Sequence, residues 1–172
     1  MSKLQQRITP CLWFDNQAEA AANYYTGIFK NSKIKNISRY TEAGHEAHHK
    51  PAGSVMTVEF ELDGQTFTAL NGGPEFRFNE AVSFQIHCKT QEDIDYFWER
   101  LTPGGDPKAQ VCGWLKDRYG VSWQVFPDRL PQLLADDDRE RAARVMNAML
   151  KMKKIDLNEI ERAAKSDVSS MA

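Results

Sequence analysis

The sequence lacks paired cysteines, long apolar runs and an excess of charge of one sign. Its three cysteines, Cys11, Cys88 and Cys112, are widely spaced and include no Cys-x-x-Cys pair. We interpret them as reduced thiols, and not as a disulfide framework or a zinc cage. At 172 residues the chain is long enough to bury a hydrophobic core without such cross-links.

No segment approaches the roughly 18 consecutive apolar residues that a membrane-spanning helix needs. Residues 1–7 also lack the apolar run of a signal peptide. We therefore expect a cytoplasmic protein with no membrane partner.

The charges of the chain nearly cancel. It has 22 Lys and Arg against 24 Asp and Glu, which gives a formal net charge of −2 and a pI of about 6.1. A protein that binds nucleic acid usually needs a basic surface to neutralise phosphates. We expect no nucleic-acid partner.

The most informative stretch is residues 117–127, which predicts a turn followed by a short strand. Gly120 suits the turn because glycine accepts a positive φ, and Pro127 ends the strand because it has no N–H for the ladder. Alternation places Trp123 and Val125 on one face, with Ser122, Gln124 and Phe126 on the other. Gln124 is therefore predicted to face a polar environment.

The first 71 residues predict the order strand, helix, strand, strand, strand. An apolar run at 8–14 precedes a helical pattern that Asp15-Asn16 is placed to cap, and Asp63-Gly64 predicts a hairpin between strands at 55–62 and 65–70. A further strand is expected at 34–40, followed by a polar loop at 41–53. The helix should bury residues at three- and four-residue spacing: Ala18, Ala21, Ala22, Tyr25 and Ile28.

The same pattern begins again after a linker at 71–79, with a strand at 82–88 and a helix at 91–101. The two strand-to-helix junctions, Asn16-Gln17 and Thr90-Gln91, are 74 positions apart, which indicates a degenerate tandem repeat. The linker begins Asn71-Gly-Gly-Pro and could also act as the hinge of a lid. We expect a first βαβββ module at 1–72, a second at 73–128 and a helical tail at 129–172.

Three segments carry a resemblance to a known family. They are the opening Thr9-Pro-Cys-Leu-Trp-Phe with the following Ala-Glu-Ala-Ala-Ala-Asn-Tyr-Tyr, the segment Cys112-Gly-Trp114, and Asp117-Arg-Tyr-Gly-Val-Ser-Trp-Gln. With the tandem repeat, they resemble the vicinal oxygen chelate superfamily of glyoxalases, dioxygenases and bleomycin resistance proteins. The closer resemblance is to its PhnB-like branch, often labelled 3-demethylubiquinone methyltransferase-like.

The resemblance implies an α+β fold in which the two modules form an eight-stranded cup, and it implies that homodimers are common. The apolar stripe of the predicted tail helix, which includes Val145, Met146 and Leu150, also favours a homodimer because it needs a surface to cover. The methyltransferase label has no support in the residues. Binding of a nucleotide-type methyl donor calls for a parallel sheet with a glycine-rich strand-to-helix turn, and no such turn is predicted.

Metal-bearing members of the superfamily take a His or Glu from the first and last strands of each module. The corresponding positions here hold Thr9, Thr68, Ser83 and Gln124, none of which is a strong ligand for a divalent ion. We therefore expect no metal and no other cofactor, with a divalent metal as the alternative.

A mixed polar and aromatic wall is expected inside the cup, suited to a small organic ligand. Its predicted ligand-binding residues are Cys11, Trp13, Gln85, His87, Cys112, Trp114 and Gln124. His87 is the best candidate for a general acid or base, although the catalytic residues are unknown, and these polar groups could instead satisfy one another. Cys112 could equally be a buried packing residue. The alternative function is a metal-dependent enzyme of the glyoxalase or dioxygenase type, with lyase, isomerase or oxygenase chemistry.

Two further clusters have simpler explanations. His45, His48 and His49 could bind a metal, but their position in the polar loop favours plain solvation. Residues 136–138 are three aspartates, which we interpret as favourable charge at the start of a helix and not as a metal site.

Overall fold

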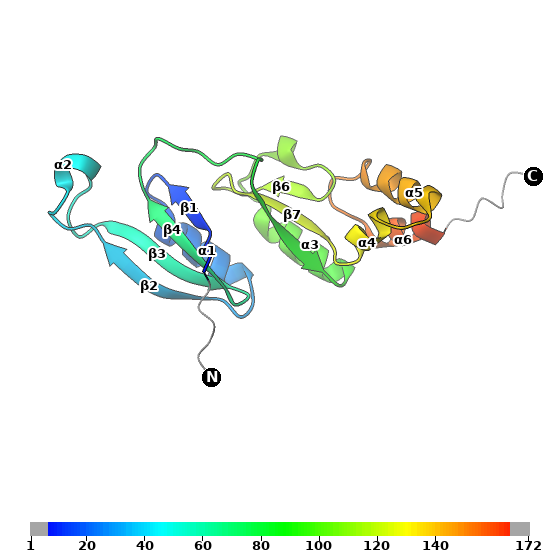
Figure 1. Ribbon diagram of the computed structural model, residues 1–172, viewed down its shortest axis with the longest axis horizontal. Helices are drawn as coiled ribbons and strands as arrows, with labels where there is room; N and C mark the ends of the chain where they lie inside the picture. The colour runs from blue at the N-terminus through cyan, green and yellow to red at the C-terminus, as the bar shows by residue number, and fades with distance from the viewer. Residues whose placement is uncertain (1–6, 166–172) are drawn as a thin grey trace, which may run out of the picture. The chain divides into compact units, whose positions relative to one another are not determined.

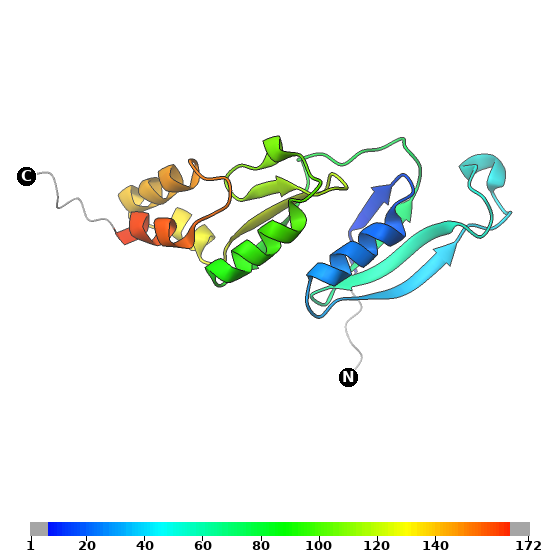
Figure 2. The ribbon, with the colours of Figure 1, turned by 180° about the vertical axis from the view of Figure 1, so that it is seen from behind.

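The computed structural model describes residues 7–165, which divide into two compact units between Phe78 and Asn79. Figures 1 and 2 show a helix and a sheet in each unit, with the C-terminal helices beside the second sheet. Within this described part of the chain, no helix has the length and apolar character needed to cross a membrane.

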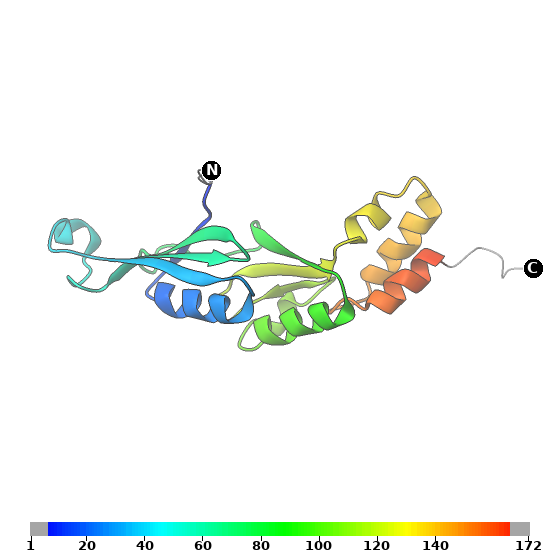
Figure 3. The same ribbon diagram turned by 90° about the horizontal axis from the view of Figure 1, so that it is seen from below.

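The first unit contains a mixed four-stranded sheet with the order β1-β4-β3-β2. β1 pairs with β4 in parallel, and the other neighbours are antiparallel. Helix α1 covers one face of the sheet, as Figure 3 shows. The elements are β1 (Cys11–Phe14), α1 (Ala18–Ile28), β2 (Lys33–Arg39), α2 (His45–His48), β3 (Val55–Leu62) and β4 (Gln65–Asn71).

The core of the first unit follows the predicted alternation. In β3, Val58, Phe60 and Leu62 are buried, whereas the residues between them are only half-buried. All five apolar residues predicted for the helix are buried on α1. The buried residues of β3 and those of α1 therefore form one hydrophobic layer between the strand and the helix.

The start of α1 differs from the sequence-based expectation, because neither Asp15 nor Asn16 caps it with a side chain. The side-chain oxygen of Asn71, at the end of β4, accepts a hydrogen bond of 2.8 Å from the backbone N–H of Ala18. The Asn71 amide also donates to the carbonyl of Val55 over 3.1 Å. Asn71 is thus a buried structural residue that ties the first turn of α1 to the sheet.

The second unit contains a three-stranded sheet with the order β5-β7-β6 and the helix α3 against one face. Its elements are β5 (Ser83–Cys88), α3 (Gln91–Leu101), the short 3-10 helix η1 (Pro107–Ala109), β6 (Trp114–Lys116) and β7 (Ser122–Pro127). The α+β class is confirmed, but the βαβββ order predicted for the second unit is not complete, because its described sheet has three strands where four were expected. Pro103 and Pro107 lack N–H groups for a ladder and flank two glycines, so the segment before β6 turns instead of pairing.

The strand register supports the internal repeat. Cys11 on β1 pairs with Thr68 on β4, and Gln85 on β5 pairs with Gln124 on β7. Each pair joins the first and the last strand of its unit in parallel, so the two pairs occupy equivalent places in the two sheets.

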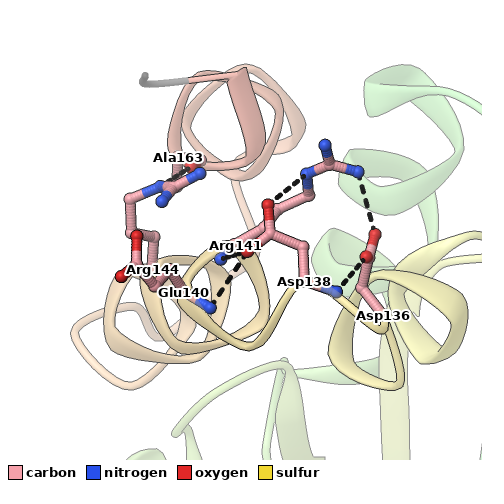
Figure 4. Close-up of polar contacts among 6 residues, drawn as sticks. All are labelled: Asp136, Asp138, Glu140, Arg141, Arg144 and Ala163. Atoms are coloured by element: carbon pink, nitrogen blue, oxygen red, sulfur yellow. Dashed lines mark hydrogen bonds and ion pairs between the residues drawn. The ribbon is translucent and has the colours of Figure 1, made fainter. Parts of the chain in front are cut away.

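The predicted tail is helical: between β7 and residue 165 it contains α4 (Leu130–Leu134), α5 (Arg139–Met149) and α6 (Leu157–Lys165). Asp138 caps α5 by accepting hydrogen bonds from the N–H groups of Glu140 and Arg141, at 3.1 and 3.0 Å (Figure 4). The Arg141 guanidinium in turn donates to Asp136 over 3.0 Å. The aspartates thus stabilise a helix start, as predicted. Residues 166–172, the end of the predicted helical tail, lie outside the described residues.

These C-terminal helices are part of the second unit. Cys112 and Gly113 donate backbone hydrogen bonds of 2.8 Å to the carbonyls of Met152 and Lys153. The Gln91 side chain, on α3, donates to the carbonyl of Ile155 and accepts from the N–H of Leu157. Because Ile155 is fully buried, the segment between α5 and α6 adds a residue to the core of this unit.

Candidate functional site

The face of the second sheet opposite α3 carries the polar side chains. Its cross-strand partners form three rows, because paired residues point to the same side of a sheet. Gln85 and His87 are exposed on this face, and Gln124 is half-buried. The rows are Ser83, Ser122 and Lys116; then Gln85, Gln124 and Trp114; then His87 and Phe126.

The centre of this face is a hydrogen-bonded group of three side chains. The Gln124 amide donates to the Ser83 hydroxyl over 2.8 Å, and its oxygen accepts from the Gln85 amide over 3.4 Å. The first bond is short and the second is at the limit of a hydrogen bond. Gln124 therefore has a fixed orientation, and Gln85 is held only weakly and can turn toward a ligand.

His87 lies at the end of the face. Its ring meets the ring of Phe126 edge to face, with centroids 5.0 Å apart. Imidazole is the only side chain in the three rows that ordinarily exchanges a proton near neutral pH. The aromatic contact orients this imidazole without occupying its nitrogens.

The opposite face of the same strands is held together by Asp117, a buried carboxylate that follows β6. One oxygen accepts from the N–H groups of Tyr119 and Val121, at 2.8 and 3.1 Å. The other oxygen accepts from the indole N–H of Trp123 over 2.8 Å. With Gly120 at φ +86°, these bonds fix the turn between β6 and β7, which sets the register that places Gln124 opposite Trp114.

The predicted site residues of the first unit lie on its sheet face opposite α1. Cys11 is exposed at the surface of this face, but the atoms around its thiol displace part of the water, and this desolvation raises the pKa of the thiol. Trp13 is held in place: its indole donates to the carbonyl of Gly73 over 2.8 Å, and its ring meets Phe76 edge to face. A Cβ at Gly72 would lie 2.2 Å from the Trp13 ring, so the linker packs directly on this side chain.

Cys112 does not share the face with Gln124. It lies at φ +52° in the tight turn before β6, beside Gly113 at φ +83°, where both N–H groups bond to the C-terminal segment. The third cysteine, Cys88, is buried in the core, and burial raises its pKa to about 12. Neither thiol lies in the three rows.

Sequence reasoning placed Ser122 on this face without counting it as a ligand-binding residue, and it missed Lys116. Lys116 pairs with Ser122 in register and forms an ion pair with Glu80. The signal was present, because Ser122 and Gln124 share a face by alternation. The short strand β6 was not recognised, so Lys116 could not be assigned to either side.

The donor set does not fit the metal site of the superfamily. Thr68, Ser83 and Gln124 offer hydroxyl and amide groups, and the Gln124 amide already bonds to Ser83 and Gln85. Across residues 7–165, no three His, Cys, Asp or Glu side chains are grouped so that they could hold a metal ion. His45, His48 and His49 lie on and beside α2. The ring centroid of His45 is 5.9 Å from that of His48 and 6.3 Å from that of His49, and the backbone N–H of Lys50 donates to the ring of His48.

Comparison with known proteins gives one family and one fold. Residues 6–126 match the family model described as 3-demethylubiquinone-9 3-methyltransferase. The PhnB protein of Bacillus cereus is 38% identical, with 69% of this chain and 97% of that chain covered and a TM-score of 0.58. Protein PA1353 of Pseudomonas aeruginosa is 16% identical over 69% of this chain and 95% of its own, with a TM-score of 0.51, which shows the shared fold. No curated protein matches the chain.

Proposed function

The chain belongs to this family, the PhnB-like branch of the vicinal oxygen chelate superfamily, and we propose that it binds a small organic ligand. The proposed site is the face of the second sheet opposite α3, with its three rows of side chains, which we call the open face. The observation that carries the proposal is the row of Gln85, Gln124 and Trp114. It places two amides and an indole side by side on a face that α3 does not cover. Amides fix the orientation of a ligand through hydrogen bonds, and an aromatic side chain supplies contact area.

The family description names a methyl transfer, and we do not propose this reaction for the chain. The connection from β1 to α1 is Asp15-Asn16-Gln17 and that from β5 to α3 is Lys89-Thr90. Neither holds a glycine-rich turn at a helix N-terminus that could bind the methyl donor. Binding without an assigned reaction is the function that the residues support.

We also propose that the ligand is held without a metal, since hydroxyl and amide side chains occupy the positions that correspond to the metal ligands. Any proton transfer would involve His87, which shares the face with Gln124. Elemental analysis of the purified protein, before and after dialysis against a chelator, tests the metal-free proposal. A metal that remains stoichiometric after dialysis would overturn it.

The homodimer and the cytoplasmic location expected from the sequence also remain proposals. Part of the apolar stripe that suggested a dimer is covered within the chain, because two of its residues, Ala142 and Val145, are buried. Met146 and Leu150 are 39% and 58% exposed, and they are what supports a contact between copies. The unpaired thiols of Cys11, Cys88 and Cys112 suit a reducing compartment.

Gln124 provides the direct test of ligand binding. A thermal-shift screen over small aromatic and oxygenated metabolites should identify compounds that stabilise the wild type. Gln124→Leu should weaken the binding of these compounds by about 1–3 kcal/mol, because a hydrogen bond is lost in a partly desolvated site. Gln124→Glu should weaken them as well, since it removes the NH₂ donor and adds a negative charge.

Asn36→Leu is the matched control, because it removes an amide from β2 in the other unit. If Gln124→Leu binds every screened compound as well as the wild type, Gln124 is a structural residue and the ligand site lies elsewhere.

A further inference from the structure

The first row of the open face contains a buried hydroxyl with no partner. Ser122 is 2% exposed, and its Oγ makes no hydrogen bond. It lies in the middle of its row, with Ser83 on one side and Lys116 on the other. A buried polar group without a partner destabilises a fold by about 1–3 kcal/mol, so its presence calls for an explanation such as contact with a ligand or a water.

Beside this hydroxyl lies the one permanently charged side chain of the three rows. The Lys116 side chain is 21% exposed, and its ammonium group contacts the carboxylate of Glu80, a 62% exposed side chain that precedes β5. The hydrogen bond from Lys116 holds the pKa of Glu80 below its ordinary value. The ammonium group therefore already accommodates a carboxylate, supplied by the chain itself.

We infer that Lys116 Nζ and Ser122 Oγ bind an anionic oxygen group of the ligand, either a carboxylate or a phosphate or phosphonate. Both side chains are donors, and an anion with several acceptor oxygens can engage the two at once. Glu80 occupies Lys116 in the absence of such a ligand and is displaced by it. The inference rests on the proposed ligand-binding face and extends it, because Gln85, Gln124 and Trp114 would then contact the remainder of the same molecule.

Three probes that share a phenyl ring separate charge from the rest of the ligand: benzoate, the neutral benzamide of the same shape, and phenylphosphonate, whose anionic group is tetrahedral. Their dissociation constants are measured by NMR titration of the backbone amides of the full chain. Benzoate or phenylphosphonate should bind about tenfold more tightly than benzamide, the effect of one additional charge-assisted hydrogen bond. The stronger of the two anions identifies the chemical source of the group.

Three variants test the named atoms. Lys116→Met should remove the preference for anions over benzamide. Ser122→Ala should weaken anion binding severalfold. Its melting temperature should be equal to that of the wild type or higher, because an unpaired buried hydroxyl is lost. Glu80→Gln should strengthen anion binding, since the internal competitor loses its charge. Lys35→Met is the matched control, because Lys35 forms an ion pair of 2.7 Å with Glu59 across two strands of the first sheet. Its loss should leave the dissociation constants of all three probes unchanged.

Equal binding of benzoate, phenylphosphonate and benzamide to the wild type would overturn the inference, as would a preference for anions that survives in Lys116→Met. The absence of saturable binding by either anion would overturn it too. The ligand-binding function is decided separately, by whether Gln124→Leu weakens the neutral compounds of the thermal-shift screen.

Discussion

Asp117 illustrates at the scale of one residue how a buried charge can organise a binding face without belonging to it. Its carboxylate accepts hydrogen bonds from two backbone N–H groups of the turn between β6 and β7 and from the indole of Trp123. The residue that follows β6 thereby fixes which residues of β7 point to the other side. A carboxylate is suited to this role because it only accepts hydrogen bonds, and all three partners donate.

We predict that Asp117→Asn lowers the free energy of unfolding by about 2–3 kcal/mol, because an NH₂ group would then face at least one N–H donor and the charge-assisted bonds would be lost. Urea denaturation followed by tryptophan fluorescence measures the change. Asp106→Asn is the control, because Asp106 accepts a similar backbone bond from Lys108 at an exposed site. A double-mutant cycle with Trp123→Phe should give a coupling energy clearly different from zero. Additive losses would contradict direct coupling of the two side chains.

At the scale of elements, the segment between α5 and α6 packs against the rest of the second unit at a glycine, Gly113. A Cβ on Gly113 would lie 2.7 Å from the carbonyl oxygen of Val125 and 3.1 Å from a side-chain carbon of Ile155. Only a residue without a side chain allows both the turn at φ +83° and the approach of this segment.

Gly113→Ala should therefore loosen the C-terminal helices. Hydrogen exchange should speed up at the amides of Cys112 and Leu157, which bond between this segment and the rest of the unit. Gly53→Ala is a matched control, because Gly53 has φ +85° and no atom within 4 Å of the added Cβ. It should show only the strain of the backbone, about 1–2 kcal/mol. Equal effects of the two substitutions would show that Gly113 is needed only for its φ.

The same junction contains an ion pair whose contribution depends on pH. Hydrogen bonds from Lys154, over 2.6 Å, and from Gln91 hold the pKa of Asp95 below its ordinary value. A carboxylate with a lowered pKa in the folded state stabilises the fold above its unfolded pKa of about 3.9, and this contribution is lost as the pH falls through the folded value.

Asp95→Asn should consequently reduce stability more at pH 7 than at pH 2.5, as measured by urea denaturation at both values. Glu92→Gln, in the first turn of the same helix, is the control for a general loss of negative charge. A loss that is the same at both pH values would mean that the carboxylate contributes nothing through its charge.

The elements that could be predicted from sequence are those whose pattern is local. The alternation at 55–62 and 122–126 indicated strands and faces correctly, and Gly64 and Gly120 marked both hairpins. The contributions of Asn71 and Lys116 could not be predicted, because each depends on a partner brought close by the fold. Gly113 gave no sign of its role either, since its constraint comes from Ile155, far along the chain.

At the scale of the whole molecule, the proposed homodimer is tested through the exposed part of α5. The wild type should sediment as a dimer at high micromolar concentration, because Met146 and Leu150 leave an apolar surface on this helix. Met146→Asp with Leu150→Asp should give a folded monomer. Asn147→Asp, an exposed residue of the same helix, is the control and should remain dimeric. A wild type that is monomeric at this concentration would refute the proposal.

The buried position of Ile155 also has a consequence for the synthesis of the protein. The chain leaves the ribosome from its N-terminus, and the first unit has all its strands and its helix once Phe78 has emerged. The second unit lacks part of its core until Ile155 and Ile160 have followed, on the order of ten seconds later at ordinary rates of translation. From the emergence of Pro127 until that of Ile155, the strands β5, β6 and β7 are all present without the residues that complete their packing. The second half of the molecule is therefore the one exposed to chaperones and proteases while it is being made.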